Sequence, residues 1–163
     1  MEIFWSIILM LLTTTALTAQ KKLCSTTVKT LDGKEMNTTD FSNNGKPMLV
    51  YLWETSCTPC TQGLKEIAPI YEIWQKKTGL KVIAVSIDDR KNHSKVKSYA
   101  ETQDWKYEIY LDDSREIMTQ MEMENPLHLW LIDGKGTIVW EQEGYTAGDT
   151  DKIAEALRTL KKE

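Results

Sequence analysis

The chain has 163 residues, of which 41% are apolar and 27% charged, with four prolines and eight glycines. This composition is that of one globular domain large enough to bury its own core. The formal net charge is −4, and lysines and arginines form no block or stripe, so we expect no nucleic-acid partner.

The first nineteen residues have the pattern of a secretion signal. Residues 3–12, "IFWSIILMLL", are too short an apolar run to span a bilayer, which takes about 20 apolar residues. The small and polar residues after them supply a cleavage site behind Ala19. We therefore expect a signal peptide over residues 1–19 and a single domain over residues 20–163, placed in the periplasm or cell envelope. An uncleaved membrane anchor is the alternative.

The remaining chain alternates between strand and helix patterns. Residues 47–53 are apolar throughout, as in a strand buried on both faces. Apolar residues then recur at three- and four-residue intervals, as in an amphipathic helix. The predicted elements are a hairpin over 27–41 with its turn at Asp32-Gly33, a strand over 47–53, a helix from Pro59 to Lys77, a strand over 80–88, a helix within 88–103, a strand over 105–113, a short helix over 114–122, a hairpin over 126–145 and a last helix capped by Asp149. This order predicts an α/β fold in which helices flank a mixed central sheet.

Two cysteines, Cys57 and Cys60, stand where the first buried strand passes into a helix. A closed zinc site needs four ligands, usually in two paired clusters. The chain adds only Cys24, His93 and His128 to this pair, and no second cluster exists. A structural zinc site is therefore not expected.

Reversible disulfide chemistry fits the pair better. A cysteine at a helix N-terminus has its thiolate stabilised by free N–H groups and by the helix dipole. The thiolate is the attacking species in disulfide exchange. We therefore predict that Cys57 is the exposed nucleophile and that Cys60, one turn into the helix, is the buried resolving thiol. Cys24 is interpreted as a reduced, partly buried residue, with a regulatory thiol as the alternative.

Several blocks of the sequence together resemble the exported thioredoxin-like proteins of the TlpA-like disulfide reductase group. These blocks are "LDGKEMNTTDFSNNGKPMLVYLWETSCTPC", "VIAVSIDD", "NPLHLWLIDGKGTIV" and "EGY". The resemblance implies a thioredoxin fold with an N-terminal β-hairpin and an inserted helix–strand unit. It also implies a monomeric protein disulfide oxidoreductase that acts on protein thiols and disulfides. The redox-active Cys57–Cys60 disulfide would then serve without a cofactor or metal.

The resemblance also implies roles for residues around the cysteines. Trp53 would be the aromatic residue before the motif and would belong to the substrate-binding residues. Pro126 would be a cis-proline facing the cysteines, and Asn125 would offer backbone groups to an extended substrate segment. Thr58 and Pro59, between the cysteines, would tune the redox potential.

The chain departs from this group at two positions where relatives have a carboxylate that takes up or releases protons during exchange. Thioredoxins have a buried Asp six residues before the first cysteine, where this chain has Tyr51. Relatives often have a Glu three residues after the second cysteine, where this chain has Gly63. Glu54 could substitute for these carboxylates, although a solvated surface carboxylate is the simpler interpretation.

Two other functions are alternatives. A Cu(I)-binding chaperone on the same fold, similar to the Sco-like proteins, would use Cys57, Cys60 and His128 as ligands. His128 lies two residues after Pro126 in a predicted strand, so alternation is expected to turn it to the same face as the proline. A peroxiredoxin-like peroxidase would need Thr or Ser three residues before the reactive cysteine and Pro four residues earlier. The chain has Glu54 and Val50 at those positions.

The direction of exchange is predicted from the two residues between the cysteines. Strongly oxidising members of the thioredoxin superfamily tend to have a histidine there, whose charge stabilises the thiolate. Thr58 is neutral and Pro59 has no N–H, so the reduced pair is less stabilised and the protein should act as a reductase. A reductase outside the cytoplasm needs a membrane thiol electron donor as partner.

Overall fold

The structure is a computed structural model that describes residues 20–160, so the expected signal peptide over residues 1–19 lies outside the described residues. Over these residues, seven strands form one mixed sheet in the order β2-β1-β5-β4-β3-β6-β7. The strands are β1 (Thr27–Thr30), β2 (Glu35–Asn37), β3 (Met48–Trp53), β4 (Lys81–Ser86), β5 (Glu108–Leu111), β6 (His128–Ile132) and β7 (Ile138–Glu143). The helices are α1 (Thr58–Thr78), α2 (His93–Thr102), α3 (Glu116–Gln120) and α4 (Thr150–Leu160), with short 3₁₀ turns at Thr38–Asp40 and Arg90–Asn92.

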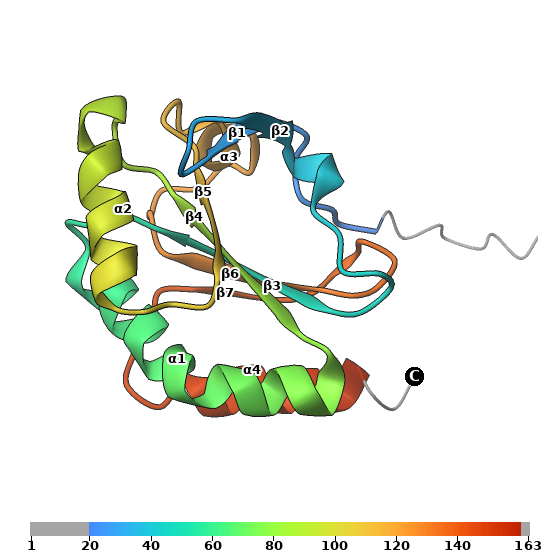
Figure 1. Cartoon of the computed structure of the whole chain (residues 1–163). Coiled ribbons are helices and arrows are strands. Elements are labelled where there is room, and N and C mark those ends of the chain that lie inside the picture. Colours follow the sequence, from blue (N-terminus) through green and yellow to red (C-terminus); the bar gives the residue numbers. More distant parts are fainter. Residues whose placement is uncertain (1–19, 161–163) are drawn as a thin grey trace, which may run out of the picture.

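Helices cover both faces of the sheet, as Figure 1 shows. Residues from α1, α2 and α4 pack with one face of β3, β4 and β6 in a single apolar cluster. Ile117 of α3, Phe41 and the segment around Leu23 pack against the opposite face. The predicted α/β fold with a mixed sheet between helices is confirmed.

Strand β3 lies at the centre of the sheet, and all six of its residues are buried. It pairs in parallel with β4 and antiparallel with β6. The continuous apolar run predicted this position, because a strand covered on both faces has no polar side. Helix α1 leaves directly from the carboxyl end of β3 and ends at Gly79, whose left-handed φ of 73° provides the C-cap.

The last helix begins where expected, but its predicted cap behaves differently. The Asp149 carboxylate accepts hydrogen bonds from Thr146 N (2.8 Å) and Gln142 Nε2 (2.6 Å). It also pairs with Lys152. The side chain therefore closes the loop between β7 and α4, while the backbone oxygen of Asp149 accepts hydrogen bonds from the helix amides of Lys152 and Ile153. No helix within residues 20–160 has both the length and the apolar composition to cross a bilayer.

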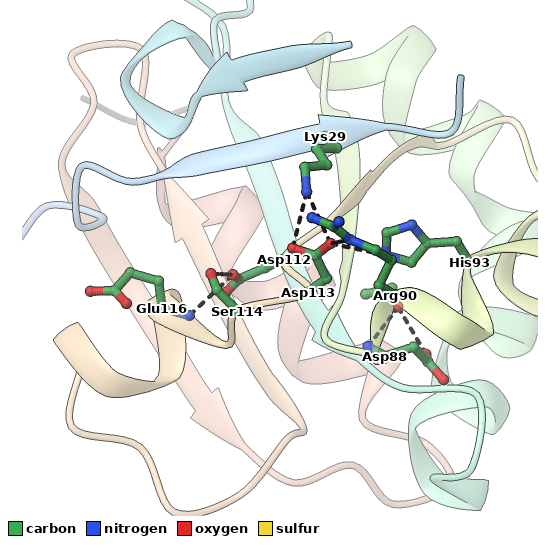
Figure 2. A network of polar contacts seen from close by, with 9 residues as sticks. Lys29, Asp88, Arg90, His93, Asp112, Asp113, Ser114 and Glu116 are labelled. Atoms are coloured by element: carbon green, nitrogen blue, oxygen red, sulfur yellow. Dashed lines mark hydrogen bonds and ion pairs between the residues drawn. The ribbon is translucent and has the colours of Figure 1, made fainter. Parts of the chain in front are cut away.

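The segment between β5 and α3 carries two adjacent carboxylates with different roles (Figure 2). Asp112 is almost fully buried, and its oxygens accept hydrogen bonds from the amides of Glu116 (3.1 Å) and Ile117 (2.9 Å). Asp113 pairs with Lys29 and Arg90 at 3.0 and 3.3 Å. Together they fix α3 and tie it to the N-terminal hairpin.

Replacing Asp112 with alanine should destabilise the fold by about 2 kcal/mol. The change removes the acceptor for two amides of the first turn of α3 and leaves those donors unsatisfied in a buried place. Urea unfolding measures the difference. Glu101→Ala, at an exposed position of α2, is the matched control and should change the unfolding free energy by less than about 0.5 kcal/mol. A similar stability for both variants would contradict this role of Asp112.

Candidate functional site

Cys57 and Cys60 form a disulfide at the N-terminus of α1. Cys57 is the N-cap residue, and its Sγ accepts a hydrogen bond from the backbone N–H of Cys60 at 3.2 Å. Cys60 is completely buried, whereas Cys57 is half-buried. The helix therefore offers free N–H groups to the first sulfur and hides the second, an arrangement suited to thiol–disulfide exchange at Cys57.

The turn before Cys57 is anchored to the neighbouring strand by Asp88. This carboxylate is only 4% exposed. It accepts hydrogen bonds from Thr55 N (2.9 Å), Thr55 Oγ1 (2.6 Å) and Ser86 Oγ (2.8 Å). Asp88 is not among the predicted site residues. The signal was present, because Asp88 and Cys57 both follow parallel strands and so meet at the same edge of the sheet.

The Glu54 carboxylate forms an ion pair and a hydrogen bond, so it is not a free carboxylate beside the cysteines. Its carboxylate accepts hydrogen bonds from Arg115 Nη2 and Ser56 Oγ, both at 3.0 Å. Arg115 precedes α3 in a left-handed conformation with a φ of 56°. The ion pair thus links the turn before Cys57 to the β5–α3 segment, and Glu54 acts here as a structural contact.

Tyr51 and Gly63 lie against each other. They are two positions at which the chain differs from the family that it resembles. The Tyr51 hydroxyl donates a hydrogen bond to the backbone oxygen of Cys60 at 3.1 Å. A Cβ added at Gly63 would overlap Tyr51 Oη and lie 2.8 Å from Cγ of Tyr145. The tyrosine therefore occupies the space into which a side chain at position 63 would project. Burial raises the pKa of the Tyr51 phenol far above its ordinary value, so it stays neutral.

A cleft of about 630 Å³ opens beside the exposed sulfur. Its walls include Cys57, Pro59, Pro126 and Tyr145. Asn125 also lines it and donates a side-chain hydrogen bond to Glu143 at the end of β7. This volume is within the range of about 300–1,000 Å³ usual for ligand pockets.

The predicted cis bond at Pro126 is wrong. All peptide bonds within residues 20–160 are trans. The trans form is favoured for an X–Pro bond by about 0.5–1 kcal/mol, and the segment reaches the cleft in that form. Pro126 and Cys57 nevertheless line the same cleft.

The predicted substrate-binding role of Trp53 is contradicted by its burial. The side chain is 0% exposed and packs edge-on against Trp105, with ring centroids 5.3 Å apart. A fully covered ring cannot touch a substrate. Its physical role is to fill the core beneath the site.

His128 does not approach the cysteines. Its ring stacks on Trp130, with centroids 4.7 Å apart, and its Nε2 lies 3.5 Å from a Glu141 oxygen. Trp130 belongs to the core on the opposite face of the sheet from Cys60. The expected alternation from Pro126 failed because β6 begins only at His128. The copper site of two cysteines and His128 is therefore wrong. No cluster of three His, Cys, Asp or Glu side chains suited to a metal occurs in the described chain.

Cys24 also lies on that opposite face, half-buried against the second core. Burial raises the pKa of its thiol, and the nearby charge of Asp112 raises it further. A thiol with a raised pKa is a poor nucleophile at neutral pH. The structure thus separates Cys24 from the redox pair in both place and reactivity.

Gly63→Ala should destabilise the protein by about 1–3 kcal/mol, the usual cost of overpacking a core. The added methyl group has no room beside Tyr51 Oη and the Tyr145 ring. In a Tyr51→Phe background the penalty should shrink, because the nearest obstructing atom is absent. A double-mutant cycle measured by urea unfolding checks this. Additive effects of the two changes would show that positions 51 and 63 do not share this space.

Comparison with known proteins places the chain. The AhpC/TSA family matches residues 19–144. The thiol–disulfide oxidoreductase ResA of Bacillus thuringiensis subsp. konkukian is 27% identical, over 72% of this chain and 65% of the relative. A chloroplastic peroxiredoxin Q of Gentiana triflora is 32% identical, over 72% of this chain and 52% of the relative.

The chain thus spans less than two thirds of the length of these curated relatives. Among solved structures, an uncharacterized thioredoxin-like protein from Porphyromonas gingivalis is similar with a TM-score of 0.78 and 37% identity. The match covers 86% of this chain and 92% of that one. The fold, the position of the cysteine pair and these likenesses agree: the chain belongs to the AhpC/TSA family as a thioredoxin-like protein.

Proposed function

We propose that this protein is an exported thiol–disulfide oxidoreductase that reduces disulfides in other proteins. The observation that carries the proposal is the Cys57–Cys60 disulfide at the N-terminus of α1, with one sulfur accessible and the other buried. The likeness to ResA supports the same chemistry. The adjoining cleft supports a protein segment as substrate, because it offers apolar walls beside the reactive sulfur.

The reaction takes two exchange steps. In the reduced protein, the Cys57 thiolate attacks one sulfur of a substrate disulfide and expels the other as a thiolate. The Cys60 thiol then loses its proton and attacks Cys57 Sγ, which releases the second substrate thiolate. Two electrons pass to the substrate, and the protein is left with the Cys57–Cys60 disulfide.

The reducing direction is inferred from Thr58 and Pro59, which place no positive charge beside the Cys57 thiolate. Thr58 is neutral, and Pro59 has no N–H to donate.

Export is inferred from residues 1–19, and it determines where the electrons come from. Outside the cytoplasm, the oxidised pair must be reduced again by a donor that crosses the membrane, so a membrane thiol protein is the proposed partner.

The likeness to a peroxiredoxin raises a peroxidase as the second candidate. The residue three positions before Cys57 is Glu54, paired with Arg115, where a peroxidase needs a hydroxyl group. Val50 stands where a peroxidase has proline, and it is buried in the central strand. These contacts favour exchange with disulfides over reduction of peroxides.

A Cys60→Ser variant should accumulate substrate proteins on Cys57 as mixed disulfides, because the resolving thiol is gone. The full chain is expressed in a bacterial host that exports it to the cell envelope. Cys24 is replaced by serine in every variant. Adducts are separated by non-reducing electrophoresis and identified by mass spectrometry. Cys57→Ser is the control and should form none. Adducts on Cys57→Ser in place of Cys60→Ser would reverse the two assignments.

The redox potential should lie nearer thioredoxin's value of about −270 mV than the value of about −120 mV of a strong oxidant. Equilibration with defined glutathione mixtures measures it. At about 1.4 kcal/mol per 30 mV, the two values differ by roughly 7 kcal/mol. A result more positive than about −180 mV would make the protein an oxidant or isomerase and overturn the proposed direction.

A further inference from the structure

The hydroxyl of Tyr51 bonds the backbone carbonyl of the buried cysteine, Cys60. Tyr51 is 0% exposed, and its Oη donates to the Cys60 carbonyl oxygen at 3.1 Å. Because β3 is the central strand, paired on both sides, the phenol is attached to the most rigid part of the sheet. The bond ties the first turn of α1 to that strand.

Glycine at position 63 makes this contact possible. A Cβ there would overlap Tyr51 Oη, so any other residue would push the phenol away from Cys60 or move the helix. Tyr145 covers the same place from the loop after β7, with its ring centroid 6.5 Å from that of Tyr51. Tyr51, Gly63 and Tyr145 therefore form one packed unit beneath Cys60.

This unit is uncharged where it meets Cys60. Burial raises the pKa of both Tyr51 and Tyr145 above their ordinary values, so neither phenol ionises at neutral pH. A neutral phenol that donates its hydrogen to a carbonyl has little tendency to take up another proton. The hydroxyl of Tyr145 donates to Glu66 at 2.9 Å, and Gln62 holds the other oxygen of that carboxylate.

We propose that Tyr51 is a positioning residue for the second exchange step, in which it holds the Cys60 peptide so that the Cys60 sulfur is aligned with Cys57. The proposal rests on the proposed function. In that step the S–S bond between Cys57 and the substrate breaks, and the Cys57–Cys60 bond forms. The proton of the Cys60 thiol passes to water or to the departing substrate thiolate, and Tyr51 takes no part in its transfer.

The chain contains a matched control for the loss of this hydrogen bond. Tyr107 is also buried, and its hydroxyl donates to the backbone oxygen of Leu64 at 2.8 Å, one turn further along α1. Tyr51→Phe and Tyr107→Phe each remove one hydroxyl that bonds a carbonyl of the same helix. Only the first of these carbonyls belongs to a reacting residue.

The test follows the reaction of the reduced full chain with 5,5′-dithiobis(2-nitrobenzoate), in a Cys24→Ser background. Attack by Cys57 releases the first thionitrobenzoate, and attack by Cys60 on the mixed disulfide releases the second. Stopped-flow absorbance separates the two phases. Urea unfolding of both variants, run alongside, reports the purely structural cost of each lost hydroxyl.

Tyr51→Phe should slow the second phase about fivefold and leave the first unchanged, the size expected when one hydrogen bond that aligns a reacting group is lost. Tyr107→Phe should lower stability to a similar degree without slowing either phase. Equal rates in the two variants, whether both slow or both normal, would overturn the positioning role. Release of one equivalent only, with no second phase in the unsubstituted protein, would instead refute the proposed redox function.

The pH profile supplies the second readout. The thiolate of Cys60 is the attacking species, so the second phase should accelerate as the pH rises from 6 to 8. The same pH dependence should hold for Tyr51→Phe, because the phenol transfers no proton in this step. A plateau in the unsubstituted protein that disappears in Tyr51→Phe would show that Tyr51 handles the proton and would overturn the proposal.

Discussion

The site depends on one constraint, which is that α1 starts at the carboxyl end of the central strand β3. The helix N-terminus brings its free amides to Cys57, and the first turn buries Cys60 against the sheet. Every other feature of the site serves this junction. Asp88 holds the turn from the neighbouring strand, Arg115 holds it from the α3 side, and the cleft opens where the junction meets the segment before β6.

Two buried polar groups near the junction, Asp88 and Tyr51, form hydrogen bonds that hold it in place. Asp88 accepts three hydrogen bonds while nearly covered, and a buried carboxylate without those donors would be costly. The Tyr51 hydroxyl similarly ties the helix to the sheet from below. The protein thus presents one partly exposed sulfur on a support that these hydrogen bonds hold in place.

Much of this arrangement could be predicted from the sequence. The apolar run of β3, the spacing of Cys57 and Cys60 and the helical period of α1 are local patterns, and they set the fold and the redox pair. The errors arose where a side chain's direction depends on contacts distant in sequence. The sequence pattern predicts the wrong face of the sheet for His128. The face that a residue takes depends on where β6 begins, and that boundary is not visible in the sequence. Trp53 looked available beside the motif, but Trp105 and Tyr99 cover it.

The packing of Tyr51 against Gly63 restricts how such a site can change over time. A single substitution that adds an acidic side chain at position 63 would collide with the phenol before it could serve any chemistry. A single substitution that shortens Tyr51 would leave a void above a glycine, in the middle of the core. Substitutions at the two positions should therefore be coupled, because each side chain limits the space of the other. Among close relatives, the residue at one position should forecast the residue at the other.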